Sequence, residues 1–193
     1  MKLLHIDSSA LGAHSVTREL SAAVAARWQD EVPGLTIDYR DLDADPIPHL
    51  TGRSLAKADP AQAEADEATL QQFLSADVVV IGAPFYNFSI PSTLKAWIDR
   101  VAVAGRTFRY TEAGPEGQAG GKQVIIVSGR GGQYGDASPA DFQEAYLRQV
   151  FGFIGIKDVE IIRAEGVAYS PQHRADALAA AHASIRSPLA KAA

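Results

Sequence analysis

Hydroxyl side chains gather in one short segment near the start of the chain, where Ser9, Ser15 and Thr17 lie close together around Val16. Hydroxyl groups and the free N–H groups of a helix N-terminus both donate hydrogen bonds to phosphate oxygens. The segment lacks the glycine patterns of dinucleotide folds and of nucleotide triphosphatases, and its hydroxyl groups suit a terminal phosphate monoester instead. The alternative is that Ser15 only caps the helix that follows. Residue types alone leave both interpretations open.

Aromatic side chains follow a β-branched run in the middle of the chain. Phe85, Tyr86, Asn87 and Phe88 come soon after the run that ends at Gly82. A loop in this position is ordinarily polar, whereas aromatic faces can wall a planar ring and an asparagine offers both a donor and an acceptor. The alternative is that the rings pack over the edge of a sheet, and this segment taken alone favours that alternative.

Glycines follow a second β-branched run, in the segment Gly129-Arg130-Gly131-Gly132. Glycine lets the backbone approach a ligand closely and leaves N–H groups free to donate. The alternative is a flexible turn in which the Arg130 side chain is solvated. Together the three segments offer a phosphate end, an aromatic wall and a glycine wall, and this combination predicts a binding site more strongly than any one of them.

Other kinds of site find little support in the 193 residues. The chain has no cysteine, no Gly-x-Ser-x-Gly elbow and no His-Glu-x-x-His motif, so we expect neither a thiol or serine nucleophile nor a metal site. His14 could lend positive charge near a phosphate, although such a histidine is more often merely exposed. His5 is expected to be a satisfied core residue, and Asp7 either caps a turn or does chemistry.

Charge and hydropathy limit the partners. The formal net charge of -5, without a Lys/Arg cluster, argues against broad binding to nucleic acid or anionic lipid. The N-terminal apolar run is too short for a signal peptide, and no apolar stretch approaches the ~20 residues of a membrane-spanning helix. We therefore expect a cytoplasmic protein with neither a nucleic-acid nor a membrane partner.

Five short segments are predicted to be strands, and helical patterns lie between them. Continuous β-branched runs are typical of strands that are covered on both faces. Apolar residues that recur every three or four positions predict helices over 16–28 and from Pro91 to Val101, and further helices are expected over 62–74, 140–153 and 172–185. The predicted strands are Leu3–Asp7, the more polar Leu35–Arg40, Val78–Gly82, Val124–Ser128 and Val159–Arg163.

This alternation predicts an α/β fold, with one domain over residues 1–193, a doubly wound five-stranded parallel sheet and helices on both faces. Five strands suit the flavodoxin-like order 2-1-3-4-5, in which a ligand binds beyond the carboxyl ends of the strands, where the strand order reverses. All three candidate segments follow strands at that edge. Two stretches, Asp41–Asp59 and Arg106–Gly121, fit no element and are expected to be long loops.

The chain also resembles a known family over essentially its whole length. The resemblance is carried by Pro84-Phe85-Tyr86-Asn87-Phe88, Thr107–Gly117, Gly129-Arg130-Gly131-Gly132 and Gly152–Ile156, of which Thr107–Gly117 is long and unusual. These segments resemble those of the FMN-dependent, NAD(P)H-using azoreductases, which are also quinone reductases. The chain departs from the pattern at Phe85, where members usually carry methionine, and at Gly129, which replaces a hydroxyl residue.

The resemblance implies a homodimer with one tightly bound FMN per subunit. Ser9 and the run Ser15-Val16-Thr17 would hold the FMN phosphate. Phe85-Tyr86-Asn87-Phe88 would line one side of the isoalloxazine ring, and Gly129-Arg130-Gly131-Gly132 would line its pyrimidine end. Tyr110 and Phe153 would help to form the substrate pocket over the exposed flavin face.

The implied activity is the two-electron reduction of quinones and aromatic azo compounds, with NADH or NADPH as co-substrate. A single pocket that both substrates use in turn implies ping-pong kinetics, and no side chain is expected to be an obligatory acid or base. One alternative is a flavodoxin-type electron carrier that serves a redox partner, and a weaker one is a binding module without enzyme activity. The mild charge and the long Arg106–Gly121 stretch favour the enzyme over the carrier.

Overall fold

A parallel sheet of five strands forms the centre of the computed structural model, which describes residues 1–136 and 138–191. The strands are β1 (Lys2–Asp7), β2 (Thr36–Asp41), β3 (Val78–Pro84), β6 (Gln123–Gly129) and β7 (Asp158–Ala164). The order across the sheet is β2-β1-β3-β6-β7, and all four pairings are parallel. Counted along the chain, this is the order 2-1-3-4-5, which confirms the predicted flavodoxin-like sheet.

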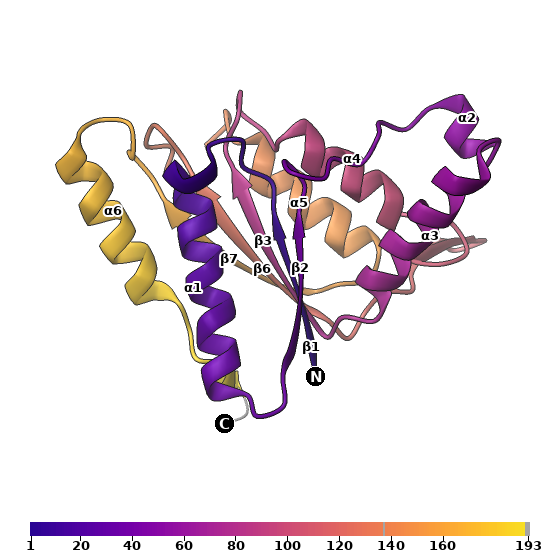
Figure 1. Cartoon of the computed structure of the whole chain (residues 1–193), viewed down its shortest axis with the longest axis horizontal. Coiled ribbons are helices and arrows are strands. Elements are labelled where there is room, and N and C mark those ends of the chain that lie inside the picture. The colour runs from indigo at the N-terminus through magenta and orange to yellow at the C-terminus, as the bar shows by residue number, and fades with distance from the viewer. Residues whose placement is uncertain (137, 192–193) are drawn as a thin grey trace.

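Helices cover both faces of the sheet, as predicted (Figure 1). They are α1 (Val16–Glu31) and α6 (Pro171–Ser184) on one face, and α3 (Pro60–Leu74), α4 (Ser92–Val101) and α5 (Phe142–Phe153) on the other. Successive strand side chains point to opposite faces of a sheet. Val79 therefore packs in the core beneath α3, α4 and α5, whereas Val80 packs in the core beneath α1 and α6.

Helix starts follow capping chemistry rather than hydrophobic periodicity. The helix predicted from residue 62 begins at Pro60, because the Asp59 carboxylate accepts the N–H groups of Ala61 and Gln62. The helix predicted to start at Pro91 begins one residue later, with Pro91 as its N-cap. Such shifts of one or two residues leave the order of the elements unchanged.

The two stretches predicted to be loops contain regular structure. Residues 106–121 hold an antiparallel hairpin made of β4 (Phe108–Thr111) and β5 (Gly114–Gly117), and residues 41–59 hold the short helix α2 (Gly52–Leu55). The prediction that both stretches lack regular elements is therefore wrong. Strands of four mostly exposed residues carry too little hydrophobic alternation to be recognised. The hairpin packs so closely on the turn after α5 that a side chain on Gly117 would overlap the backbone of Gly155.

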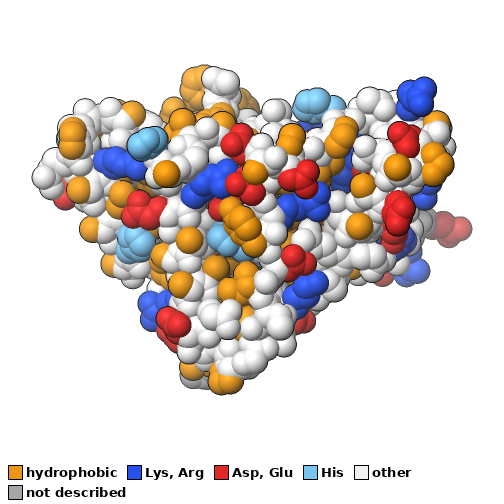
Figure 2. Space-filling view, in the orientation of Figure 1, with side chains coloured by type: hydrophobic (Ala, Val, Ile, Leu, Met, Phe, Trp, Pro, Cys, Tyr) orange, Lys and Arg blue, Asp and Glu red, His pale blue; other side chains and the backbone are white. Residues whose placement is uncertain are grey.

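The remaining elements are two short 3-10 helices, η1 (Gly12–His14) and η2 (Pro188–Lys191). Among the described residues, no helix is both long enough and apolar enough to span a bilayer. On the face that Figure 2 shows, acidic and basic side chains are interspersed without a broad patch of either sign.

Candidate functional site

A cavity of about 280 Å³ lies at the carboxyl ends of β1, β3 and β6. All three loops singled out in the sequence contribute to it, and so do the loop after β7 and the first turn of α6. The neighbouring strands β1 and β3 end at this edge, and the chain leaves them toward opposite sides of the sheet, which is where doubly wound folds bind ligands. The lining residues are Ser9, Leu11, His14, Ser15, Val16, Thr17, Pro84, Phe85, Tyr86, Gly129, Gly131, Val167, Ala168 and Arg174.

Hydroxyl groups and free backbone donors form one end of the cavity. Ser15 is the N-cap of α1, and its Oγ accepts the Arg18 N–H at 3.2 Å and lies 3.1 Å from Thr17 Oγ1. Helix geometry leaves the N–H groups of Val16 and Thr17 without an intrahelical carbonyl. Ser15 is therefore a cap and a lining residue at once, so the two interpretations of this segment are compatible. The donors and the helix dipole together favour an anion here.

Arg18 holds this end of the cavity in shape from behind. Its Nε and Nη2 donate to the Ser9 carbonyl at 3.2 and 2.8 Å, and its guanidinium binds both oxygens of Asp41 at 2.6 and 2.7 Å. The hydrogen bonds from Arg18 hold the pKa of the Asp41 carboxyl below its ordinary value. Such bidentate pairs are strong and directional. No sequence pattern indicated this pair, because Asp41 ends the most polar strand.

A polar cluster, buried except for Tyr39, supports the same loop from the sheet side. Ser21 Oγ donates to Asp7 Oδ1 at 2.8 Å and lies 3.0 Å from His5 Nε2, and the Tyr39 hydroxyl donates to Asp7 Oδ2 at 3.0 Å. Tyr39 is 52% exposed, and the partial desolvation of its hydroxyl, followed by the negative charge of Asp7, raises the pKa of Tyr39 to about 12. A side chain on Gly82 would overlap the Asp7 carboxylate. His5 is thus the satisfied core residue that the sequence predicted, and the Asp7 carboxylate is engaged within the core.

The aromatic segment after β3 is a tight turn with an uncommon backbone. Tyr86 and Ser89 exchange two backbone hydrogen bonds of 3.0 Å, and Asn87 and Phe88 between them have φ values of 49° and 70°. A positive φ is rare for a residue as bulky as Phe88, and strain of this kind concentrates at functional sites. Phe85 and Tyr86 line the cavity. The other two residues do not, and the Phe88 ring stands 52% exposed beside it.

Two glycines of the third segment keep the cavity open. A Cβ on Gly129 would lie 2.9 Å from Thr17 Cγ2, and one on Gly131 would lie 3.3 Å from the Ala168 Cβ. Both glycines line the cavity, whereas Gly132 lies outside it, where its carbonyl accepts the Gly166 N–H at 2.9 Å. The backbone of this segment therefore forms the glycine wall, over two of the three glycines.

Arg130 points away from the cavity into the protein. Its side chain is fully buried and forms ion pairs with Asp141 at 2.7 Å, with Glu144 at 2.5 Å and with Glu165 at 3.1 Å. The solvated side chain considered as the sequence alternative is therefore wrong. The guanidinium lies 5.0 Å from the centre of the Phe85 ring, so it supports the aromatic wall from inside. Its three acidic partners come from elements distant in the sequence, which is why no local pattern revealed them.

Tyr110 and Phe153 lie near each other but outside the cavity. Phe108 joins them, with its ring centre 5.6 Å from that of Tyr110 and 4.5 Å from that of Phe153. Tyr110 on the hairpin is 74% exposed, and Phe153 at the end of α5 is half-buried. Within one chain the two residues therefore form an aromatic cluster of their own.

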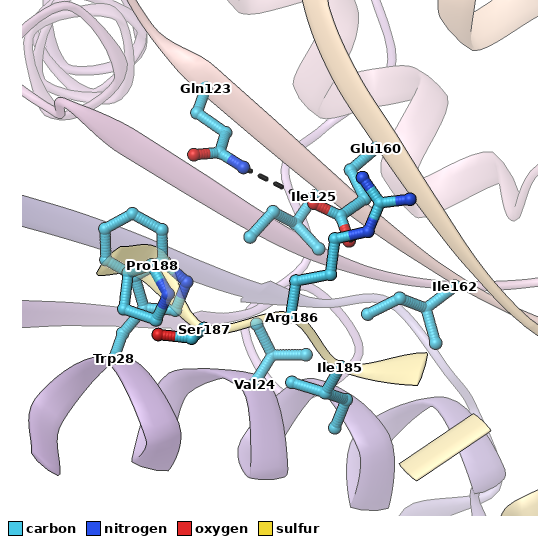
Figure 3. A pocket seen from close by; sticks show the side chains of 10 residues that line it. All are labelled: Val24, Trp28, Gln123, Ile125, Glu160, Ile162, Ile185, Arg186, Ser187 and Pro188. Atoms are coloured by element: carbon cyan, nitrogen blue, oxygen red, sulfur yellow. Dashed lines mark hydrogen bonds and ion pairs between the residues drawn. The ribbon is translucent and has the colours of Figure 1, made fainter. Parts of the chain in front are cut away.

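The other hollows are poorer candidates. The gap drawn in Figure 3, between α1, the β6 and β7 strands and the segment from Ile185 to Pro188, measures about 10 Å³ and can hold one water molecule at most. A broader hollow of about 740 Å³ lies at the amino ends of the strands, the opposite edge from the one where such folds bind ligands. In the described part of the chain, no cluster of three or more histidines and acidic residues could hold a metal ion.

Comparisons with known proteins identify relatives of this chain and of its fold. A family model described as a flavodoxin-like fold matches residues 1–189. An FMN-dependent NADH:quinone oxidoreductase of Xanthomonas oryzae pv. oryzae is 68% identical over 96% of this chain and 95% of its own, and one of Stenotrophomonas maltophilia is 67% identical over 97% and 95%. The solved FMN-dependent NADH-azoreductase of Bacillus anthracis in complex with FMN superposes with a TM-score of 0.89, at 27% identity, over 100% of this chain and 99% of that one.

Proposed function

We propose that this chain, which belongs to the family of FMN-dependent NADH:quinone oxidoreductases within the flavodoxin-like fold, binds FMN in the cavity described above and reduces quinones and aromatic azo compounds at the expense of NADH. The family membership supports the reaction class. The observation that carries the proposal is the cavity itself, whose wall combines hydroxyl donors, aromatic rings and glycine backbone. A single domain over residues 1–193 would hold one such site.

The chemistry of the cavity fits a phosphorylated flavin. Among the described residues, its lining contains the hydroxyl groups of Ser9, Ser15 and Thr17 and no carboxylate, so a phosphate would meet donors without repulsion. A side chain larger than hydrogen at Gly129 would crowd Thr17 and narrow the space beside these donors. We infer that Ser9 and Ser15-Val16-Thr17 hold the FMN phosphate.

The aromatic and glycine segments would hold the ring system. Phe85, Tyr86, Asn87 and Phe88 are proposed to line one side of the isoalloxazine, and Gly129-Arg130-Gly131-Gly132 its pyrimidine end. Arg130 would act indirectly, because its guanidinium packs against the Phe85 ring and supports it. When bound, FMN would supply the redox chemistry by taking a hydride from the reduced nicotinamide and giving two electrons to the acceptor. The side chains bind and orient, and none is assigned as an acid or base.

The chain is proposed to work as a cytoplasmic homodimer with FMN bound tightly in each subunit. The Tyr110–Phe153 cluster lies outside the cavity of its own chain, and we propose that it contacts the substrate pocket of a second subunit. Because nicotinamide and acceptor would use one pocket in turn, we expect ping-pong kinetics. The kinetic test described next also compares NADPH with NADH as the reductant.

Steady-state kinetics of the FMN-loaded protein with a soluble quinone test this function. Double-reciprocal plots at several quinone concentrations should be parallel, and the rate should rise with FMN content until one flavin is bound per subunit. Apoprotein supplied with riboflavin is the control for the cofactor, and NADPH in place of NADH tests the nicotinamide. Absence of quinone turnover by the fully FMN-loaded protein would exclude the proposed activity, and intersecting plots would exclude the shared pocket.

A further inference from the structure

One cation lines the cavity from an element that no sequence pattern connected with it. Arg174 lies in the first turns of α6, half-buried, and is the only lysine or arginine among the described residues that line the cavity. The exposed His14 is the only other basic residue in that described lining, which includes no aspartate or glutamate. The wall therefore carries positive charge with no acidic group to balance it.

The contacts of Arg174 fix its guanidinium beside the hydroxyl cluster. Its Nη2 donates to the His14 carbonyl at 3.0 Å, and His14 directly precedes Ser15, the N-cap of α1. This bond uses one of the five N–H donors of the group. The first turns of α1 and α6 lie at the same edge of the molecule, as Figure 1 shows, so Arg174 joins the two helices where the backbone donors of α1 are free.

Arg174 also differs from the other arginines around the site because no carboxylate of the described residues neutralises its charge. Arg18 is paired with Asp41, and the buried Arg130 is paired with three carboxylates. Within residues 1–136 and 138–191, Arg174 has no carboxylate within ion-pair distance. Glu19, the acidic residue in the first turn of α1, lies against His182 instead, at 3.3 Å. A half-buried arginine beside a helix N-terminus, with no acid to neutralise it, favours the binding of an anion.

We propose that Arg174 is the counter-ion of the cofactor phosphate and so makes the cavity select a phosphorylated flavin over an unphosphorylated one. The inference rests on the proposed function, because it assumes that a flavin occupies this cavity. The guanidinium donors that are not bonded to His14 would face the dianionic phosphate, opposite the hydroxyl groups and free N–H groups of α1.

Flavin binding by Arg174→Gln tests the proposal, with apoprotein titrated separately with FMN and with riboflavin and the flavin fluorescence followed. We expect R174Q to weaken FMN binding by roughly 10- to 100-fold, the range for losing one charge-assisted hydrogen bond, and to leave riboflavin binding unchanged. The loss should shrink as salt is added, because salt screens the half-exposed charge. Arg174→Lys keeps the positive charge but not the planar guanidinium, and it should weaken FMN binding less than R174Q does.

Arg148→Gln is the matched control. Arg148 on α5 also donates one hydrogen bond to a backbone carbonyl, that of Val159 at 3.1 Å, but it lies outside the cavity. R148Q makes the same change in net charge and should leave the affinity for both flavins unchanged.

Two results would overturn the role of Arg174. Unchanged FMN affinity in R174Q would show that the guanidinium does not meet the phosphate. Equal weakening of FMN binding and riboflavin binding would show that Arg174 only shapes the cavity. If R174Q proves unstable, the same two affinities measured on R174K decide whether Arg174 contacts the phosphate. Failure of the unmodified protein to bind FMN at all would instead contradict the proposed function, so the two failures are distinguishable.

Discussion

Replacing Arg130 by methionine is expected to be the most destabilising single change near the site. The side chain is fully buried, and its loss would leave Asp141 and Glu165 without their arginine partner and Glu144 with Arg163 alone. Breaking a buried ion pair by removing one partner costs about 3–5 kcal/mol, because the remaining charge stays desolvated. The whole free energy of unfolding of a domain is about 5–15 kcal/mol. Arg130→Met should therefore remove a large share of it.

Arg163 provides the matched control, because it binds the same Glu144 carboxylate at 2.5 Å but leaves its own side chain 34% exposed. Because the Arg163 end of the pair is partly exposed and Glu144 keeps Arg130 in this variant, Arg163→Met should be mild by comparison. In the Arg130→Met background, Glu165→Gln should recover part of the loss, since it removes a carboxylate whose arginine partner is gone, whereas Glu144 still has Arg163.

Urea unfolding followed by the fluorescence of Trp28 and Trp97 measures these differences directly. The expected order of stability is the unmodified protein, then R163M, then R130M. If R130M lost no more stability than R163M, burial would not be what makes the Arg130 cluster important, and the reasoning above would be refuted.

Three further variants test separate features of the molecule. Thr17→Val should weaken FMN binding by about 1.5–3 kcal/mol and leave riboflavin binding unchanged. Thr69→Val, at a threonine that is also buried, is the control, and an equal loss for both flavins would show that Thr17 does not contact the phosphate. Because the pKa of Tyr39 is raised to about 12, the folded state loses stability as pH rises from the ordinary tyrosine value of 10.0 towards 12, and Tyr39→Phe should flatten that decline in urea unfolding. Tyr110→Ala should keep the fold and the flavin but change the KM or kcat for acceptors by about 1 kcal/mol, and unchanged kinetics with every acceptor would make Tyr110 merely structural.

The sheet could be predicted because its signal is local. Runs such as Val78–Ile81 and Val124–Val127 are apolar on both faces, which is what a parallel strand covered by helices requires. Once five strands alternate with helices, the handedness of the connections leaves few topologies. The loops after those strands must then meet at one edge of the sheet, and for that reason residue order alone predicts that Ser9, Thr17, Phe85, Tyr86 and Gly129 share one site.

The parts that sequence reasoning missed depend on contacts between distant residues. Arg130 stands in a glycine segment, where a charge usually faces water, and only the fold brings Glu144 from α5 and Glu165 from beyond β7 to it. Arg174 was overlooked for the same reason, since nothing in α6 marks the turn that meets His14. The β4–β5 hairpin was missed because its strands are short and mostly exposed.

The absorbance of the FMN-loaded protein under anaerobic conditions decides between an enzyme and an electron carrier. Addition of one equivalent of NADH, with no other protein present, should bleach the flavin band, and a subsequent equivalent of quinone should restore it. A flavin band that NADH leaves unchanged until a separate reductase is added would contradict the proposed oxidoreductase and favour the carrier.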